Sequence, residues 1–208
     1  MTEPFRFQQG DDSWQRLRRK ALANLYWFCE HVLDYGKRIP MTVGAHRLLC
    51  DFVAGATGEP ALDGARYRKL ELPRDWGKTT IVTQGYVIQR ICADPETSIL
   101  IANEKEQNAK DFLHSVKAQF ENNELLRALF PEVIPVDLNE TTWSASRIVG
   151  NRTSGRKEPT VFVIGVGGTV TGMHPDLIVV DDMISREAME NARAGSWQIM
   201  HQVNRWIN

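Results

Sequence analysis

The first part of the chain carries apolar residues at the spacing of an amphipathic helix. After Asp11-Asp12-Ser13, residues of the kind that cap helices, apolar positions recur until Gly36 ends the pattern. These positions are Trp14, Leu17, Leu22, Leu25, Cys29, Val32 and Leu33. A second helix is predicted from Ala45 to about Ala54, and a loop follows it at 55–60. We expect residues 1–60 to form a helical segment that packs on the rest of the domain.

From Tyr67 onward the pattern predicts strands that alternate with helices. The predicted strands are 68–72, 98–103, 143–145, 160–165 and 177–180. The predicted helices are 78–91, 106–120, 125–130 and the tail 186–208. Strands that alternate with helices indicate a parallel sheet with helices on both faces. The predicted fold class is therefore α/β, with the sheet-containing core over 61–208 and a helical extension before it.

The composition is that of an ordinary globular domain and excludes a disordered or fibrous chain. The 208 residues are 42% hydrophobic and 25% charged, a size and make-up that suit one domain. Lys and Arg number 25 and Asp and Glu 26, so the formal net charge is −1. Because no overall basic field exists, any contact with DNA must be local.

The cysteines and the N-terminus indicate the cellular compartment of the protein. Cys29, Cys50 and Cys92 are odd in number and widely spaced, which favours buried thiols in a reducing compartment over disulfides or a zinc site. The N-terminus is polar and acidic, without the layout of a signal peptide. No apolar run approaches the ~20 residues of a membrane span. We expect a soluble, cytoplasmic protein without a membrane partner.

A Gly-Lys-Thr sequence at a predicted strand-to-helix junction is the first candidate for chemistry. Backbone N–H groups at a helix start form an anion site, in which Lys78 would reach the β- and γ-phosphates of ATP and Thr79 would ligate Mg²⁺. The first glycine of the usual phosphate-loop pattern is Leu72 here. The residues expected to contact the nucleotide are Pro73, Arg74, Asp75, Trp76, Gly77, Lys78, Thr79 and Thr80.

An acidic pair ends the most apolar of the short predicted strands. Leu177-Ile178-Val179-Val180 is followed by Asp181-Asp182, which places two carboxylates at the carboxyl end of a buried strand, where open α/β sheets bind ligands. In a phosphate-loop enzyme Asp181 would hold Mg²⁺ through its water shell, and Asp182 would orient and help deprotonate the attacking water. The alternative is that the pair caps a helix that begins near Ser185.

The combination of three segments resembles the ATPase domain of tailed-phage terminase large subunits. The segments are Pro73-Arg74-Asp75-Trp76-Gly77-Lys78-Thr79-Thr80, Gly167-Gly168-Thr169-Val170-Thr171-Gly172 and His174-Pro175-Asp176-Leu177-Ile178-Val179-Val180-Asp181-Asp182. The family often writes its Walker A loop without the first glycine, which accounts for Leu72. The resemblance covers roughly residues 40–206 and implies a P-loop NTPase fold of the RecA-like (ASCE) class.

What the resemblance implies is an ATP-driven motor that pumps double-stranded DNA into a viral procapsid. Such a motor works as a homo-oligomeric ring on the portal protein with the small terminase subunit, in the cytoplasm of the infected host, with a monomer in solution as the alternative. The family also carries a C-terminal nuclease domain, which is not expected in this chain, so no DNA cleavage is expected.

The resemblance also implies an arginine that stabilises charge in the transition state. Arg74, inside the loop, is a candidate that acts within its own subunit, and Arg152 and Arg156 are candidates for a finger donated to a neighbouring subunit. The alternative for the last two is a solvated loop. His46 and Arg47 lie where related ATPases contact the adenine, although a structural role is the more common one for such a pair.

Two alternatives to the active packaging ATPase remain open. The first is a nucleotide-binding assembly module with little intrinsic hydrolysis. Another P-loop DNA-dependent ATPase, such as a helicase, would need motifs that the chain does not contain.

Overall fold

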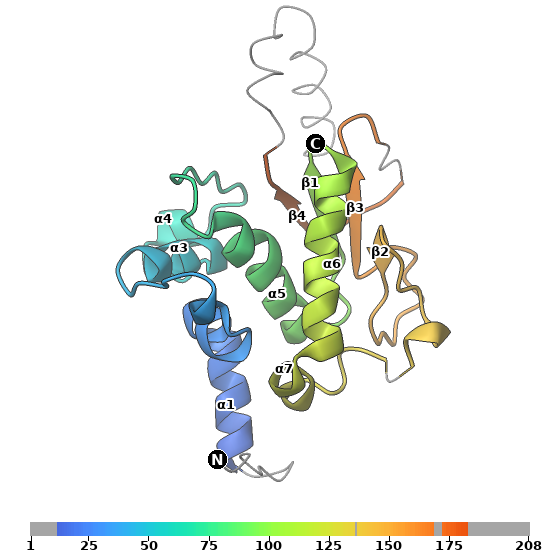
Figure 1. The fold of residues 1–208 in the computed structure, drawn as a ribbon, viewed down its shortest axis with the longest axis horizontal. Helices are drawn as coiled ribbons and strands as arrows, with labels where there is room; N and C mark the ends of the chain where they lie inside the picture. Colours follow the sequence, from blue (N-terminus) through green and yellow to red (C-terminus); the bar gives the residue numbers. More distant parts are fainter. Residues whose placement is uncertain (1–11, 136, 169–171, 183–208) are drawn as a thin grey trace, which may run out of the picture.

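The computed structural model describes residues 12–135, 137–168 and 172–182, and it shows an α/β fold built on one mixed sheet (Figure 1). The four strands are β1 (Ile99–Asn103), β2 (Arg147–Ile148), β3 (Val161–Gly165) and β4 (Leu177–Val180). Their order across the sheet is β2-β3-β1-β4. Strand β1 therefore lies at the centre, although it comes first in the chain.

The three longer strands run parallel, so their carboxyl ends meet at one edge of the sheet. Residue Ile99 of β1 is paired with Val161 of β3 and Leu177 of β4. The short strand β2 runs antiparallel to β3. The strands predicted at 98–103, 160–165 and 177–180 are confirmed.

Helices cover the sheet face that holds the odd-numbered residues of β1. Helix α6 (Glu106–Asn122) packs along β1 and β3, and it is followed by α7 (Glu124–Leu129). The predicted helix over 78–91 is observed as η3 (Thr79–Tyr86), which is π-helical and continues into α5 (Val87–Ala93). None of the described helices is long and apolar enough to cross a bilayer.

The opposite face carries a smaller apolar cluster. Leu100, Ala102, Phe162 and Ile164 pack there with Val166, Met173 and Ile178. These partners come from the sheet itself and from the segments that follow β3 and precede β4. In the described part of the chain, the helices that pack closely on the sheet belong to one face, whereas the sequence predicted helices on both.

The long N-terminal helix predicted by the apolar spacing is interrupted. Helix α1 (Asp12–Ala23) ends before Asn24, which has extended backbone angles (φ −140°, ψ 101°) and caps the next helix with its side chain. That helix is α2 (Leu25–Trp27), which continues into the π-helical η1 (Phe28–Val32), and a 3₁₀ turn η2 (Tyr35–Lys37) follows. The interruption arises because the Asn24 side chain accepts a hydrogen bond from Trp27 N (2.8 Å) and so starts a new helix.

The second predicted helix is confirmed as α3 (Ala45–Ala54), and a short helix α4 (Pro60–Asp63) follows. The strand predicted at 68–72 is not formed. Arg68 instead binds backbone carbonyls at the end of α3 and in α4, including Asp63 O (2.7 Å). Leu70 and Leu72 still pack on the core, whereas Lys69 and Glu71 still face solvent. The alternation of apolar and polar residues therefore reflects which side chains are buried, and not pairing in a sheet.

The strand predicted at 143–145 is also wrong in position. Trp143 forms only an isolated bridge to Ile148, and the paired strand β2 begins at Arg147. Trp143 Nε1 instead donates to Glu121 Oε1 (2.6 Å), which ties this segment to α6. A 3₁₀ turn η4 (Leu138–Glu140) precedes it. The predicted tail helix 186–208 lies outside the described residues.

Close packing between the two π-helical segments predicts the effect of a substitution at Gly85. A Cβ atom there would lie 2.6 Å from Cys29 Sγ, which belongs to η1 and is fully buried. We expect Gly85→Ala to lower the free energy of unfolding by about 1–2 kcal/mol, because overpacking outweighs the better helix propensity of alanine. Urea denaturation measures this, with Gly155→Ala as the control because an added Cβ meets nothing there. Equal stability of the two variants would contradict this packing.

Candidate active site

The loop at residues 73–78 alternates between left-handed and right-handed backbone angles where it leads into the helix. Asp75 and Gly77 both have φ of +64°, and Lys78 returns to right-handed helical angles. Successive residues of opposite hand turn their N–H groups toward the same concave side, as in phosphate-binding nests. The helix then starts at once, since Ile81 N donates to Gly77 O (2.8 Å). The first N–H groups of a helix have no partner within it and carry the positive end of its dipole.

Gly77 also has a steric reason to be glycine. A Cβ atom at this position would lie 2.6 Å from Ile39 Cδ1. The loop therefore passes close over the segment after η2, and that contact helps to hold the turn in place.

The acidic pair lies at the carboxyl edge of the sheet, directly after β4. Asp181 is buried, with 5% of its surface exposed, and its N–H donates to Ala102 O (3.0 Å). Its carbonyl accepts from Asn103 Nδ2 (2.8 Å) at the end of β1. Its carboxylate accepts from the Thr83 hydroxyl (2.9 Å). Both the backbone and the side chain of Asp181 are thus fixed by neighbouring elements.

Asp182 differs from its neighbour in both exposure and backbone. Its φ is +44°, a left-handed value that is uncommon for residues other than glycine but is tolerated by Asp. The side chain is 79% exposed.

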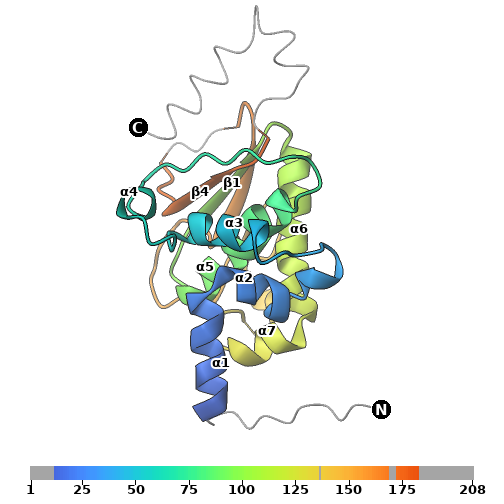
Figure 2. The same ribbon diagram turned by 90° about the vertical axis from the view of Figure 1, so that its left-hand side faces the viewer.

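The two segments predicted to share a nucleotide are brought together. Lys78 Nζ lies 3.8 Å from Asp182 Oδ1, although the residues are 104 positions apart. The Thr83–Asp181 hydrogen bond makes a second, independent link between the same helix and the same strand. Figure 2 shows the segment that follows α4 running across the view in front of β4 and β1. The contact between Lys78 and Asp182 is too exposed to contribute much stability, but it shows that the two charges face one volume.

Asp181 and Thr79 are the residues that could hold a magnesium ion arriving with a nucleotide. No group of three or more metal-binding side chains exists among the described residues, so a dedicated all-protein cage is not seen there. Mg²⁺ is usually held by one or two carboxylates together with substrate phosphates and water. Asp181 and Thr79 supply oxygen ligands of that type, from the strand end and the helix start.

The arginines expected near the site separate into two places. Arg74 is exposed within the loop itself. Arg152 lies at the opposite edge of the sheet, where it donates to the backbone carbonyls of Thr97 and Glu158. Arg156 lies nearby and pairs with Asp176 (2.6 Å). Both side chains join segments of their own chain at the amino ends of β1 and β4, and they do not lie near Lys78.

Several side chains at this opposite edge have shifted pKa values. Burial lowers the pKa of Arg152, and the neighbouring Arg156 lowers it further. Glu96 accepts hydrogen bonds from the hydroxyl and backbone groups of Thr153 and Ser154, which lower its pKa to about 2. The network therefore binds the 152–156 loop to the turn before β1 and is an architectural feature of the sheet.

Trp76 and His46 meet beside the phosphate loop. Their rings are stacked with centroids 6.2 Å apart, and Trp76 is 43% exposed whereas His46 is buried. Thr42 N donates to His46 Nδ1 (2.9 Å), which leaves the proton of the neutral ring on Nε2. Nε2 is buried without a hydrogen-bond partner among the described residues.

Arg47 pairs with Asp51 on the surface of α3 (3.6 Å). The two alternatives for His46 and Arg47, a structural role and an adenine contact, both stay predictions.

Two residues at the site escaped the sequence reasoning. Thr83 is one helical turn beyond Thr79, and nothing in the motif distinguishes it from the apolar residues around it. Asn103 ends an otherwise apolar strand, and this buried amide was the available signal, since buried polar groups at a strand end require partners.

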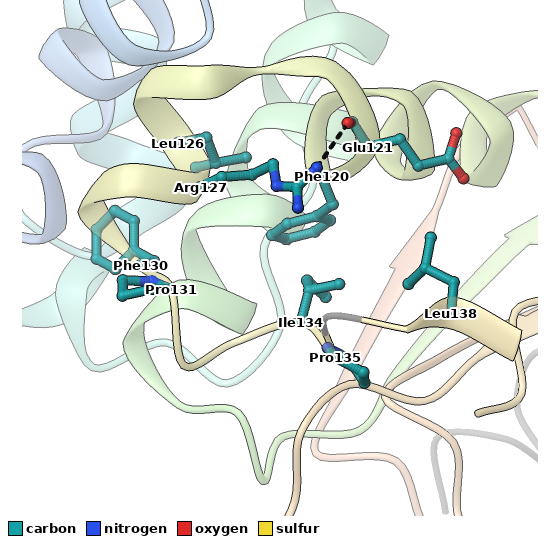
Figure 3. A pocket seen from close by; sticks show the side chains of 9 residues that line it. All are labelled: Phe120, Glu121, Leu126, Arg127, Phe130, Pro131, Ile134, Pro135 and Leu138. Atoms are coloured by element: carbon teal, nitrogen blue, oxygen red, sulfur yellow. Dashed lines mark hydrogen bonds between the residues drawn. The ribbon is translucent and has the colours of Figure 1, made fainter. Parts of the chain in front are cut away.

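A separate hollow lies at the far end of α6 and is not part of this site (Figure 3). Its volume is about 220 Å³, below the range usual for ligand pockets. Its lining is Phe120, Glu121, Leu126, Arg127, Phe130, Pro131, Ile134, Pro135 and Leu138. The guanidinium of Arg127 turns to the carbonyl of Glu121 (3.1 Å). The lining is mainly apolar and offers no phosphate site.

Comparisons with protein-family models, with curated proteins and with solved structures give no significant match. The function of the site therefore rests on its own geometry and on the motifs in the sequence.

The loop geometry predicts that Gly77 cannot be replaced without loss. We expect Gly77→Ala to reduce the free energy of unfolding by about 1–2 kcal/mol, because an L side chain is strained at this positive φ and its Cβ meets Ile39. Nucleotide binding should weaken as well. Calorimetry and nucleotide titration measure the two effects. Gly44→Ala is the control, since an added Cβ has open space there; full binding by Gly77→Ala would contradict the role of this turn.

The Glu96 network predicts a specific pH dependence of stability. The folded-state pKa of about 2 lies below the value of about 4.3 for a free Glu, so the contribution is present above about pH 4.3 and is lost as the pH falls toward 2. Urea midpoints of wild type and Glu96→Gln should differ most at pH 6 and converge toward pH 2. A difference that stays constant over this range would show that the ionised carboxylate is not what the loop requires.

Proposed function

We propose that this chain is the ATPase domain of a viral DNA-packaging motor, with a P-loop NTPase site formed by residues 73–80 and the acidic pair. The observation that carries the proposal is the approach of Lys78 to Asp182 across a nest-shaped loop at a helix start. A cationic loop and two carboxylates at one sheet edge are the parts that phosphoryl transfer requires. The resemblance to terminase large subunits supplies the specific motor.

In this proposal the chain's own residues position ATP and the water that attacks it. The loop N–H groups and Lys78 bind the phosphates, and Thr79 and Asp181 hold the metal with its water shell. Magnesium, when bound, neutralises the phosphate charge that develops in the transition state. Asp182 orients a water molecule for in-line attack on the γ-phosphorus. The bond from that phosphorus to the β–γ bridging oxygen breaks, a proton passes from the water to Asp182, and ADP and phosphate leave.

The partners and location follow from the same proposal. Double-stranded DNA, the portal protein and the small terminase subunit are the proposed partners of a homo-oligomeric ring in the host cytoplasm. Since the chain is slightly acidic, DNA would be held through local clusters such as the exposed Arg16 and Arg19 of α1.

One observation favours a second candidate, a nucleotide-binding module with little turnover. Arg152 and Arg156 are held by carbonyls and carboxylates of their own chain, so neither is poised for donation to a neighbour. Without such an arginine, a phosphate-loop site loses about 10³–10⁵-fold in rate. Phosphate release measured at increasing protein concentration separates the two: a specific activity that rises with concentration indicates an arginine supplied between subunits.

Substitutions at the two charges test the proposal directly. Lys78→Ala should weaken binding of ATP with Mg²⁺ and lower phosphate release by about 100-fold or more, because it removes the cation at the phosphates. Asp182→Asn should retain ATP binding and lose hydrolysis. Lys69→Ala, at an exposed lysine paired with Glu71, is the matched control and should behave as wild type. Unchanged ATP binding and hydrolysis in Lys78→Ala would refute the site.

A further inference from the structure

We infer that Thr83 is a positioning residue that sets the orientation of the Asp181 carboxylate toward the metal of a bound nucleotide. This inference rests on the proposed function and deepens it. It concerns a residue outside the phosphate-loop motif, one turn further along the helix.

The contact that suggests this role is a buried one between distant parts of the chain. Thr83 Oγ1 donates to Asp181 Oδ2 at 2.9 Å across 98 positions of sequence. Thr83 is 1% exposed and Asp181 is 5% exposed. A hydrogen bond from a hydroxyl to a carboxylate is stronger than one between neutral groups, and more so where water is excluded.

The Thr83 hydroxyl does not bind the acceptor that is usual for a threonine within a helix. A threonine inside a helix commonly donates its hydroxyl to the carbonyl four residues earlier, which here is that of Thr79. The hydroxyl of Thr83 is directed across to the strand end instead. The helix is π-helical over Thr79–Tyr86, a rare form that is frequently found at functional sites.

The rest of Asp181 is already fixed, so the hydroxyl controls what freedom remains. The backbone of Asp181 is held by Ala102 O and by the Asn103 amide on β1. These bonds leave the side chain free to rotate, and Thr83 binds one of its oxygens, Oδ2. The other oxygen, Oδ1, is the one that we infer to serve the water shell of the metal.

Thr79 and Thr83 thus have different proposed roles on one side of the helix. Residues four apart lie close together on a helix surface. Thr79 serves the metal directly in the proposed site, and Thr83 serves the carboxylate that faces the metal. Groups that orient a ligand in this way typically change metal affinity by about 10–100-fold when they are removed.

The test is a titration of Mn²⁺ into the full chain with ADP, with free Mn²⁺ followed by electron paramagnetic resonance. Thr83→Val keeps the shape and removes the hydroxyl, and it should raise the Mn²⁺ concentration at half-saturation by about 10-fold or more. Binding of a fluorescent ADP analogue in EDTA should be unchanged, because the loop contacts are intact. Thr83→Ser should restore the wild-type midpoint. If Thr83→Val does not fold, Thr83→Ala tests the same hydroxyl without adding an atom.

Thr160→Val is the matched control. Thr160 is also 1% exposed, and its hydroxyl accepts a buried hydrogen bond from Gly150 N (2.9 Å) near the opposite edge of the sheet. It should lose stability without any change in the Mn²⁺ midpoint. A wild-type midpoint in the hydroxyl-free Thr83 variant would overturn the inference and leave the proposed function standing. Wild type that binds no nucleotide with or without Mn²⁺ would overturn both.

Discussion

The parallel pairing of β1 with β3 and β4 is the constraint on which the site depends. Because these strands run in the same direction, the residues that follow them emerge at one edge of the sheet. Asn103 ends β1 there and binds the carbonyl of Asp181, which follows β4. The helix that begins at Lys78 starts at the same edge, so Lys78 comes within 3.8 Å of the Asp182 carboxylate.

The two edges of the sheet are held by different kinds of interaction. At the carboxyl edge, a buried carboxylate depends on a threonine hydroxyl and an asparagine amide, and its exposed neighbour faces a lysine. At the amino edge, Arg152 and Arg156 bind carbonyls and carboxylates of the turns before β1 and β4. The interactions at the amino edge hold loops against the sheet. The residues at the carboxyl edge are therefore the candidates for catalysis.

Much of the fold could be predicted because burial leaves a period in the sequence. The strands β1, β3 and β4 and the helices α3, α6 and α7 follow apolar runs or helical spacing. The interruption at Asn24 and the unpaired segment 68–72 could not, because a side-chain cap and the tertiary contacts of Arg68 decided them. The alternation of apolar and polar residues at 68–72 does correspond to buried and exposed side chains, but a strand also needs a neighbouring strand whose backbone groups are free to pair with it.

The candidate site shows the same division. Gly77, Lys78, Asp181 and Asp182 carry signals that sequence can reveal, since glycine at a turn and charge after an apolar strand are local features. The links made by Thr83 and Asn103 join residues more than 70 positions apart, so only the folded chain reveals them. The placement of Arg152 and Arg156 likewise depended on which edge of the sheet their loop packs against.

The most direct test of a shared nucleotide site is a crystal structure of the chain with a non-hydrolysable ATP analogue and Mg²⁺. The account predicts phosphates within the turn at Gly77, with Lys78 moved from Asp182 to the γ-phosphate and Asp181 facing the water shell of the metal. An analogue bound elsewhere on the molecule, while the contact between Lys78 and Asp182 stays intact, would contradict it.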